Sequence, residues 1–264
     1  MTREEKFQQL LGIHEKWGNK LIFSEIIESD QAKIYLSEED PSCYYNYATP
    51  KTEPEEFNWN EFDKVFSEKG KNPALYLSEE NQANGFLESA VRHNFKIAAA
   101  DTWLLLDTDY YKTAASEVDV TNVTQESFDD YKNIMNEVFA DYPGNEGYLE
   151  MCRKVQSGEA RSGVSDFVAE FYLINDGAIP VSGAGMFYSK RGGFAYLHNT
   201  GTLKAFRGRG YQTSLVRHRI DKALSLGVTN IYSLVEHGEQ SWRNLIKVGF
   251  KEAQVVDLMS KAAS

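Results

Sequence analysis

The chain has 264 residues, an apolar fraction of 42% and a formal net charge of −11. This composition is sufficient for one large or two modest packed domains and excludes wholesale disorder. The negative charge argues against a nucleic-acid partner, because binding to phosphates depends on Lys and Arg. Cys43 and Cys152 give neither a disulfide framework nor the spacing of metal ligands. We therefore expect a cytoplasmic protein with reduced thiols and no metal site.

No membrane segment is expected either. Residues 1–7 are charged and lack the apolar run of a signal peptide. The most apolar stretch, residues 97–106, is interrupted by Asp101 and is too short to span a bilayer.

The first half is expected to mix helices with short strands. In chain order these are a helix over 3–17, strands over 20–27, 32–37 and 43–49, a helix over 59–69, a strand over 74–78, a helix over 84–93 and a strand over 96–106. The loop at 50–56 contains Pro and several acids, the opposite of a phosphate site.

The second half is expected to start near Ser116. It should contain a strand over 118–123, a helix over 126–139, a polar connector with a short helix over 142–160, strands over 167–175, 178–189 and 194–203, a helix over 210–226, a strand over 230–235, a helix over 239–248 and a strand over 251–259. The two halves end alike, with a strand–helix–strand unit from Tyr76 to Phe95 and another from Tyr232 to Phe250. An internal duplication and a chance match are both open at this point.

A basic segment follows the last of the three consecutive strands. Residues 190–222 hold eight Lys and Arg but one acid, Asp221, which is typical of a solvated helix face or of a site for a phosphorylated ligand. Inside it, Gly208 and Gly210 lie between Arg207 and the start of an amphipathic helix. Glycines let backbone N–H groups approach an anion, and a helix N-terminus adds positive charge. The pattern predicts a diphosphate cradle, with an ordinary strand–turn–helix as the alternative.

This segment resembles motif A of the GNAT superfamily, Q/R-x-x-G-x-G/A, with Arg207 first and Gly210 fourth. Gln212 replaces the small sixth residue and is expected to point away from the ligand. The ending Lys247-Val248-Gly249-Phe250 resembles the end of motif B, and the resemblance covers residues 116–260. It implies an α/β (α+β) fold with a mixed, mostly antiparallel sheet flanked by helices. Residues 116–264 would be the catalytic domain and residues 1–112 a degenerate copy, making a tandem of related halves.

The resemblance also implies acetyl-CoA as co-substrate, held in a V-shaped split between the strands over 194–203 and 230–235. The pantetheine arm would pair with the backbone near residues 202–204. The implied cofactor-binding residues are Thr202, Leu203, Lys204, Arg207, Arg209, Gly210, Tyr211, Gln212, Thr213 and Asn244. The acceptor pocket is expected from residues 142–160 and parts of the first half.

Three residues are candidates for the chemistry. Strand alternation places His198 on one face with residues 196, 200 and 202, where it would be a general base or a hydrogen-bonded structural histidine. Glu236 would relay a proton, hold a cationic substrate, or be a surface acid. Many relatives protonate the leaving thiolate with a Tyr at the position of Leu245, so Ser241 is the donor candidate here. Its alternative role is hydrogen bonding at a helix N-terminus.

The preferred function is N-acetyl transfer to a small or protein-borne primary amine by direct attack in a ternary complex. A non-catalytic acyl-CoA-binding or regulatory protein is the first alternative, and a tandem-fold transferase that uses aminoacyl-tRNA is the second. One strand follows Phe250 where relatives often have a hairpin. The sheet edge is therefore expected to be completed by the N-terminal half or by a second chain in a homodimer.

Overall fold

The computed structural model describes residues 2–113, 118–142 and 145–261. The first half contains α1 (Arg3–Gly18), β1 (Glu25–Glu28), β2 (Ala32–Leu36), β3 (Tyr47–Pro50), α2 (Trp59–Glu68), β4 (Ala74–Leu77), α3 (Glu79–Ala83), α4 (Phe86–Arg92) and β5 (Phe95–Leu106). The second half contains β6 (Thr121–Asn122), α5 (Phe128–Val138), α6 (Asn145–Gln156), β7 (Val168–Asp176), β8 (Ile179–Ser189), β9 (Phe194–Thr202), the 3₁₀ turn η1 (Lys204–Phe206), α7 (Tyr211–Ser225), β10 (Asn230–Glu236), α8 (Gln240–Val248) and β11 (Phe250–Lys261).

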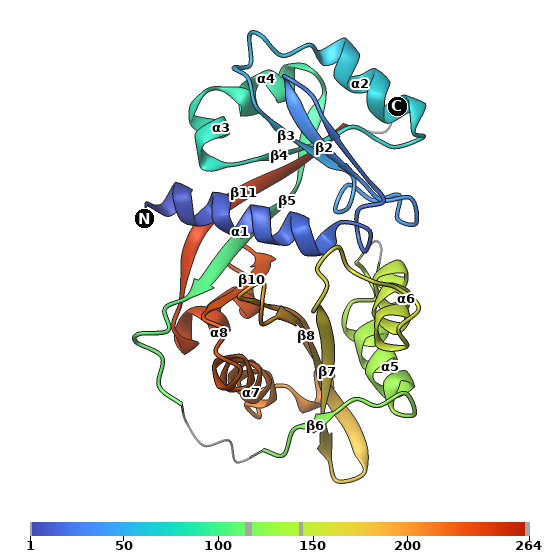
Figure 1. Cartoon of the computed structure of the whole chain (residues 1–264), viewed down its shortest axis with the longest axis vertical. Helices are drawn as coiled ribbons and strands as arrows, with labels where there is room; N and C mark the ends of the chain where they lie inside the picture. Colours follow the sequence, from blue (N-terminus) through green and yellow to red (C-terminus); the bar gives the residue numbers. More distant parts are fainter. Residues whose placement is uncertain (1, 114–117, 143–144, 262–264) are drawn as a thin grey trace.

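Within the described residues, one sheet of eleven strands runs through both halves in the order β1-β2-β3-β4-β11-β5-β10-β9-β8-β7-β6. The last strands of the two halves are exchanged: β5 lies between β11 and β10, and β11 lies between β4 and β5. Figure 1 shows this pair crossing the centre of the molecule. The edge left open after Phe250 is thus completed by the first half of the same chain.

The two halves repeat one order of elements, which confirms the mixed, mostly antiparallel fold built as a tandem. The segments β1–β5 and β7–β11 share one order of elements. Each has three strands, then a helix, a strand, a helical segment and a final strand. The helix expected over 84–93 is present as α4, and a further short helix, α3, precedes it; Gly85, with a φ of 87°, separates the two. The connector helix α6 is longer than expected, with twelve residues.

Alternating strand residues build two layers on opposite faces of the sheet. Trp103 of β5 packs edge-on against Phe7 of α1, with ring centroids 5.6 Å apart. Its neighbour Leu104 faces the other way and packs in one cluster with Leu215 and Ile220 of α7. Helices α1, α5 and α6 therefore cover the Trp103 face, while α7 and α8 cover the Leu104 face. No helix among the described residues is long and apolar enough to cross a membrane.

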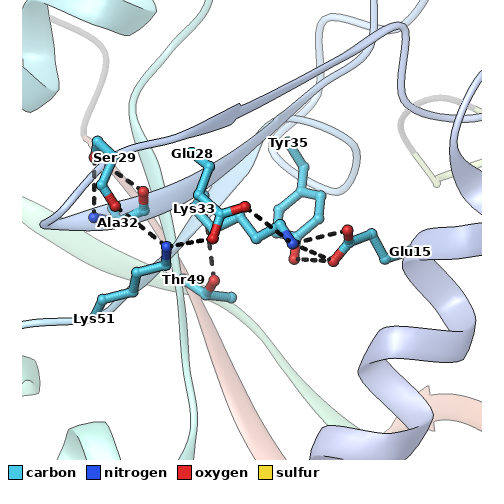
Figure 2. A network of polar contacts seen from close by, with 8 residues as sticks. All are labelled: Glu15, Glu28, Ser29, Ala32, Lys33, Tyr35, Thr49 and Lys51. Carbon is cyan, nitrogen blue, oxygen red and sulfur yellow. Dashed lines mark hydrogen bonds and ion pairs between the residues drawn. The ribbon is translucent and has the colours of Figure 1, made fainter.

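Polar contacts attach α1 to the first half of the sheet (Figure 2). Lys33 of β2 pairs with Glu15 of α1 at 2.7 Å, and the Tyr35 hydroxyl donates a hydrogen bond to the same carboxylate at 3.2 Å. Lys51 pairs with Glu28 of β1 at 2.7 Å. Because the Lys33 and Glu15 side chains are partly shielded from water, this pair is screened less than an exposed one. The ion pair holds α1 in place, and His14, the residue before Glu15, faces the interior.

Candidate active site

The expected split between β9 and β10 is present. These parallel strands pair only at their beginnings, from Asn230 opposite Phe194 to Tyr232 opposite Tyr196, and then separate. The Ser233 hydroxyl donates a hydrogen bond to the carbonyl of Leu197 at 2.7 Å, where the split opens. Beyond this point no strand among the described residues pairs with the edge of β9 that faces β10, so an extended ligand can pair there.

A bulge in β9 changes which side chains face which layer. Asn199 has a φ of 38°, and the register with β8 shifts between Gly183 and Gly185. His198 faces the α5–α6 layer, whereas the Thr200 hydroxyl accepts a hydrogen bond from Arg219 of α7 at 2.6 Å. The expected strict alternation through residues 200 and 202 is therefore wrong, because the bulge adds one residue.

Arg219 fixes this bulge from inside the protein. It is 1% exposed, and its guanidinium donates hydrogen bonds to the carbonyls of Leu215, Gly185 and His198 over 2.7–3.1 Å. Burial lowers the pKa of Arg219 to about 10, so it remains charged at neutral pH. Its signal in the sequence was a cation on the apolar face of an amphipathic helix.

A cavity of about 1000 Å³ follows the split and extends into the first half. Its second-half walls are the turn before α7, β9, the end of β10 and the first turn of α8. Tyr44, Tyr45, Tyr47, Tyr76 and Asp101 are among its first-half walls. Tyr142, Asn145 and Tyr148 also line it, so both regions expected to build an acceptor pocket border one space.

The turn before α7 presents free donors to this cavity. Gly208 and Gly210 both have a φ of 81°, and the space where a side chain would lie is open at each. Among the described residues, the backbone N–H groups of residues 208–213 have no hydrogen-bond partner, and no side chain caps α7. In the first half, by contrast, Asn58 caps α2 by accepting a hydrogen bond from the Glu61 N–H at 3.2 Å. An anion can therefore bind at α7 but meets a capped, acidic turn at α2.

Seven of the ten predicted cofactor-binding residues line the cavity. They are Thr202, Arg207, Gly210, Tyr211, Gln212, Thr213 and Asn244. Leu203, Lys204 and Arg209 do not. β9 ends at Thr202 and the chain turns into η1, while Arg209 pairs with Asp176 at 2.6 Å and lies over the Phe206 ring. Arg207 lies across the strand end, donating a hydrogen bond from Nε to the Thr202 carbonyl at 3.1 Å.

His198 is buried and neutral. The Tyr148 hydroxyl bonds its Nδ1, and its Nε2 is buried without a partner among the described residues. Burial, followed by the charge of Arg219, holds the pKa of His198 well below its usual value. A histidine with so low a pKa is a weak proton acceptor at neutral pH.

Ser241 and Glu236 both line the cavity from the second half. Ser241 lies in the first turn of α8, and its Oγ accepts a hydrogen bond from Nε2 of Gln212 at 3.2 Å, which leaves the hydroxyl proton available. Glu236 ends β10 and accepts a hydrogen bond from the Tyr142 hydroxyl at 2.6 Å.

Asp101 is a cavity residue that sequence reasoning missed. It lies on β5 directly opposite Glu236 in the antiparallel register and is half-buried. Burial, with a further contribution from Glu236, raises the pKa of Asp101 to about 7, while the Tyr76 hydroxyl opposes the shift. The signal in the sequence was a single acid inside the apolar run 97–106.

These features define a protein with the tandem GNAT fold. Residues 131–250 match the model of the acetyltransferase (GNAT) family, so the second half of the chain contains a GNAT domain. Members of this family are acyltransferases.

Solved structures resemble the whole chain. A GCN5-related N-acetyltransferase from Kribbella flavida is 14% identical with a TM-score of 0.66, over 100% of this chain and 96% of that one. A functionally unknown conserved protein from Staphylococcus epidermidis is 14% identical with a TM-score of 0.70, over 92% and 96%. A tandem GNAT protein from the clavulanic acid biosynthesis pathway is 12% identical with a TM-score of 0.59, over 88% and 79%. These likenesses show a shared fold. No curated protein matches this sequence.

Proposed function

We propose that this protein transfers an acetyl group from acetyl-CoA to a primary amine by direct attack in a ternary complex, in the cytoplasm. The free N–H groups of residues 208–213 support this most directly, because they border the cavity that follows the β9–β10 split. Residues 116–264 would then be the catalytic domain. Residues 1–112 would be a copy without a cofactor site, since Asn58 caps the corresponding helix.

The residues present fit the diphosphate of the coenzyme. The N–H groups of the turn and the N-terminus of α7 favour an anion, and Arg207 adds a whole positive charge beside them. The free edge of β9 after Leu197 offers backbone donors and acceptors to an extended amide chain. When bound, acetyl-CoA supplies an activated acyl group with a thiolate leaving group.

The chain itself must move protons and hold the amine. Ser241 supplies a hydroxyl proton at the second-half wall, where Gln212 orients its oxygen. Most of an amine is protonated near neutral pH, so a carboxylate that can accept a proton is needed on the acceptor side. Asp101 and Glu236 are the carboxylates that lie there.

Titration calorimetry with acetyl-CoA tests the proposal. The double variant Arg207→Ala, Gly210→Glu should lose measurable binding, because one cation is removed and an anion is placed among the free N–H groups. Gly227→Glu is the matched control, since Gly227 also has a positive φ, of 78°, with open space around it, but lies at the far end of α7. Unchanged binding by the double variant would place the coenzyme elsewhere.

Turnover then separates the enzyme from a regulatory coenzyme-binding protein. Release of free thiol with a panel of primary amines is expected for the wild type. Coenzyme binding without thiol release from any amine would favour the regulatory alternative.

A further inference from the structure

The cavity is lined by charged groups of both signs, which come from different elements. The arginines, Arg207 and Arg219, come from the turn before α7 and from α7 itself. The carboxylates come from β5 as Asp101, from the end of β10 as Glu236 and from the turn before α8 as Glu239. The end that lies between the two halves, which we call the acceptor chamber, is lined by Tyr44, Tyr45, Tyr47, Tyr76, Asp101 and Glu236.

The two chamber carboxylates are adjacent. Asp101 and Glu236 are cross-strand partners on β5 and β10, so their side chains project from the same face of the sheet. Trp103 and Tyr232, two and four residues away on the same strands, pack in the core on that face. Among the described residues, neither carboxylate forms an ion pair with a Lys, Arg or His within 4.0 Å. A pair of like charges without a counter-ion is unfavourable, so an occupant that carries positive charge would stabilise it.

The chamber walls favour an organic cation. Tyr44, Tyr45, Tyr47 and Tyr196 line the cavity, and their hydroxyls have no hydrogen-bond partner in the described part of the chain. Aromatic faces attract ammonium groups, and the free hydroxyls can accept their N–H bonds. A metal ion is not indicated, since no cluster of three or more His, Cys, Asp or Glu occurs among the described residues.

Among the described residues that line the chamber, no side chain provides the missing positive charge. His14 projects from α1 into the cavity wall, but burial lowers its pKa to about 3. The other titratable groups near Asp101 are an acid, phenols and a thiol. They are Tyr47 from β3, Tyr76 from β4, Tyr196 from β9, Glu236 from β10, and Cys43, Tyr44 and Tyr142 from the connecting segments.

We infer that the acetyl acceptor is a small cationic amine whose ammonium group binds between Asp101 and Glu236, against the tyrosines of the acceptor chamber. The inference rests on the proposed function and adds the class of acceptor. It also gives the degenerate first half a role, because β5 and residues 44–47 supply most of the chamber. We take the acceptor to be a small molecule, because α1, β5 and the segment that carries Tyr44, Tyr45 and Tyr47 wall the chamber.

Matched acceptors test the charge preference. The probes are 1,4-diaminobutane and 4-aminobutanoate, which have the same length but carry an ammonium or a carboxylate at the second end. The diamine is expected to have a kcat/KM at least about tenfold higher, since each tenfold step corresponds to about 1.4 kcal/mol of differential interaction. Equal or better use of 4-aminobutanoate, or acetylation of a lysine-containing peptide in place of the diamine, would overturn the inference.

Matched variants test the residues. Asp101→Asn and Glu236→Gln should each raise KM for 1,4-diaminobutane about tenfold while the Kd of acetyl-CoA stays unchanged. Asp257→Asn is the control, because Asp257 is a partly buried acid on the adjacent strand β11 that does not line the cavity. An unchanged KM in both Asp101→Asn and Glu236→Gln would show that these carboxylates do not recognise the acceptor.

A binding readout keeps this inference separate from the transfer reaction. Without acetyl-CoA, 1,4-diaminobutane should raise the Tm of the wild type and of Asp257→Asn, but not that of Asp101→Asn. Failure of the wild type to bind acetyl-CoA would refute the proposed function and leave this result interpretable. A Tm rise of equal size in Asp101→Asn would refute the binding of the ammonium group at Asp101. The proposed acetyl transfer would not be affected by that result.

Discussion

Gln212 of α7 donates a hydrogen bond from Nε2 to Oγ of Ser241 in α8 over 3.2 Å, and its amide oxygen accepts one from Asn244. The sixth position of the motif usually carries a small residue, so the larger Gln212 is a departure from it. Its side chain joins the first turns of two helices that border the cavity. The departure therefore has a structural role and orients Ser241.

We predict that Ser241→Ala lowers kcat at least about tenfold with little change in the Kd of acetyl-CoA, because it removes a proton donor but no coenzyme contact. Steady-state kinetics and calorimetry check both parts. Ser225→Ala is the control, since its hydroxyl donates a hydrogen bond to the Lys222 carbonyl at the end of α7 and does not line the cavity. Wild-type turnover by Ser241→Ala would remove this serine from the chemistry and leave it as a residue that connects helices.

Asp101 should make stability depend on pH in an unusual direction. Its pKa is raised to about 7 in the folded protein, whereas an Asp in an unfolded chain has a pKa of about 3.9. Between these values the folded state holds a proton that the unfolded state has lost, so this group's contribution to stability falls as the pH rises and is constant above both.

Asp101→Asn should therefore match the wild type near pH 3.5 and be more stable at pH 8, by at most about 4 kcal/mol. Urea unfolding at both pH values measures the difference. The same stability difference at pH 3.5 and at pH 8 would show that Asp101 titrates normally.

Arg219→Met should destabilise the fold. The change leaves the carbonyls of Leu215, Gly185 and His198 without this buried donor, at a cost of about 2–4 kcal/mol that exceeds the relief from burying a charge. Arg217→Met, two residues earlier and less buried, should cost under about 1 kcal/mol. Chemical unfolding measures the stability of the two variants. An equal loss of stability in both would show that the buried hydrogen bonds of Arg219 do not stabilise the bulge.

Gly185→Ala should also destabilise the protein, by about 1–3 kcal/mol. A methyl group there would overlap the His198 ring, which is held by buried neighbours and cannot move away easily. Gly12→Ala is the control, because the space beside Gly12 in α1 is open and alanine favours a helix. Thermal unfolding should separate them, with no loss in Gly12→Ala; a harmless Gly185→Ala would mean that His198 is loosely packed.

Features that depend on neighbouring residues in the chain could be predicted from sequence. Apolar periodicity located α7 within one residue at each end, and the Gly208–Gly210 turn before it has the expected free N–H groups. The bulge at Asn199 has no comparable signal, since it depends on buried contacts from Arg219.

Features that depend on distant strands could not be predicted in this way. Asp101 meets Glu236 only because β5 is inserted beside β10, and no local pattern encodes that pairing. The tyrosines at 44–47 belong to the same case, since they reach the cavity from the other half of the chain. The sequence predicted that parts of the first half border the acceptor pocket, but which residues do so depends on the strand order.

The exchange of β5 and β11 makes the two halves depend on each other for a complete sheet. The first half alone would leave β4 and β5 without β11, the strand that joins them, and the second half alone would lose β5 from between β10 and β11. Severed halves should therefore regain structure only when mixed. The first half, which we propose to lack a coenzyme site, therefore supplies a strand on which the sheet of the second half depends.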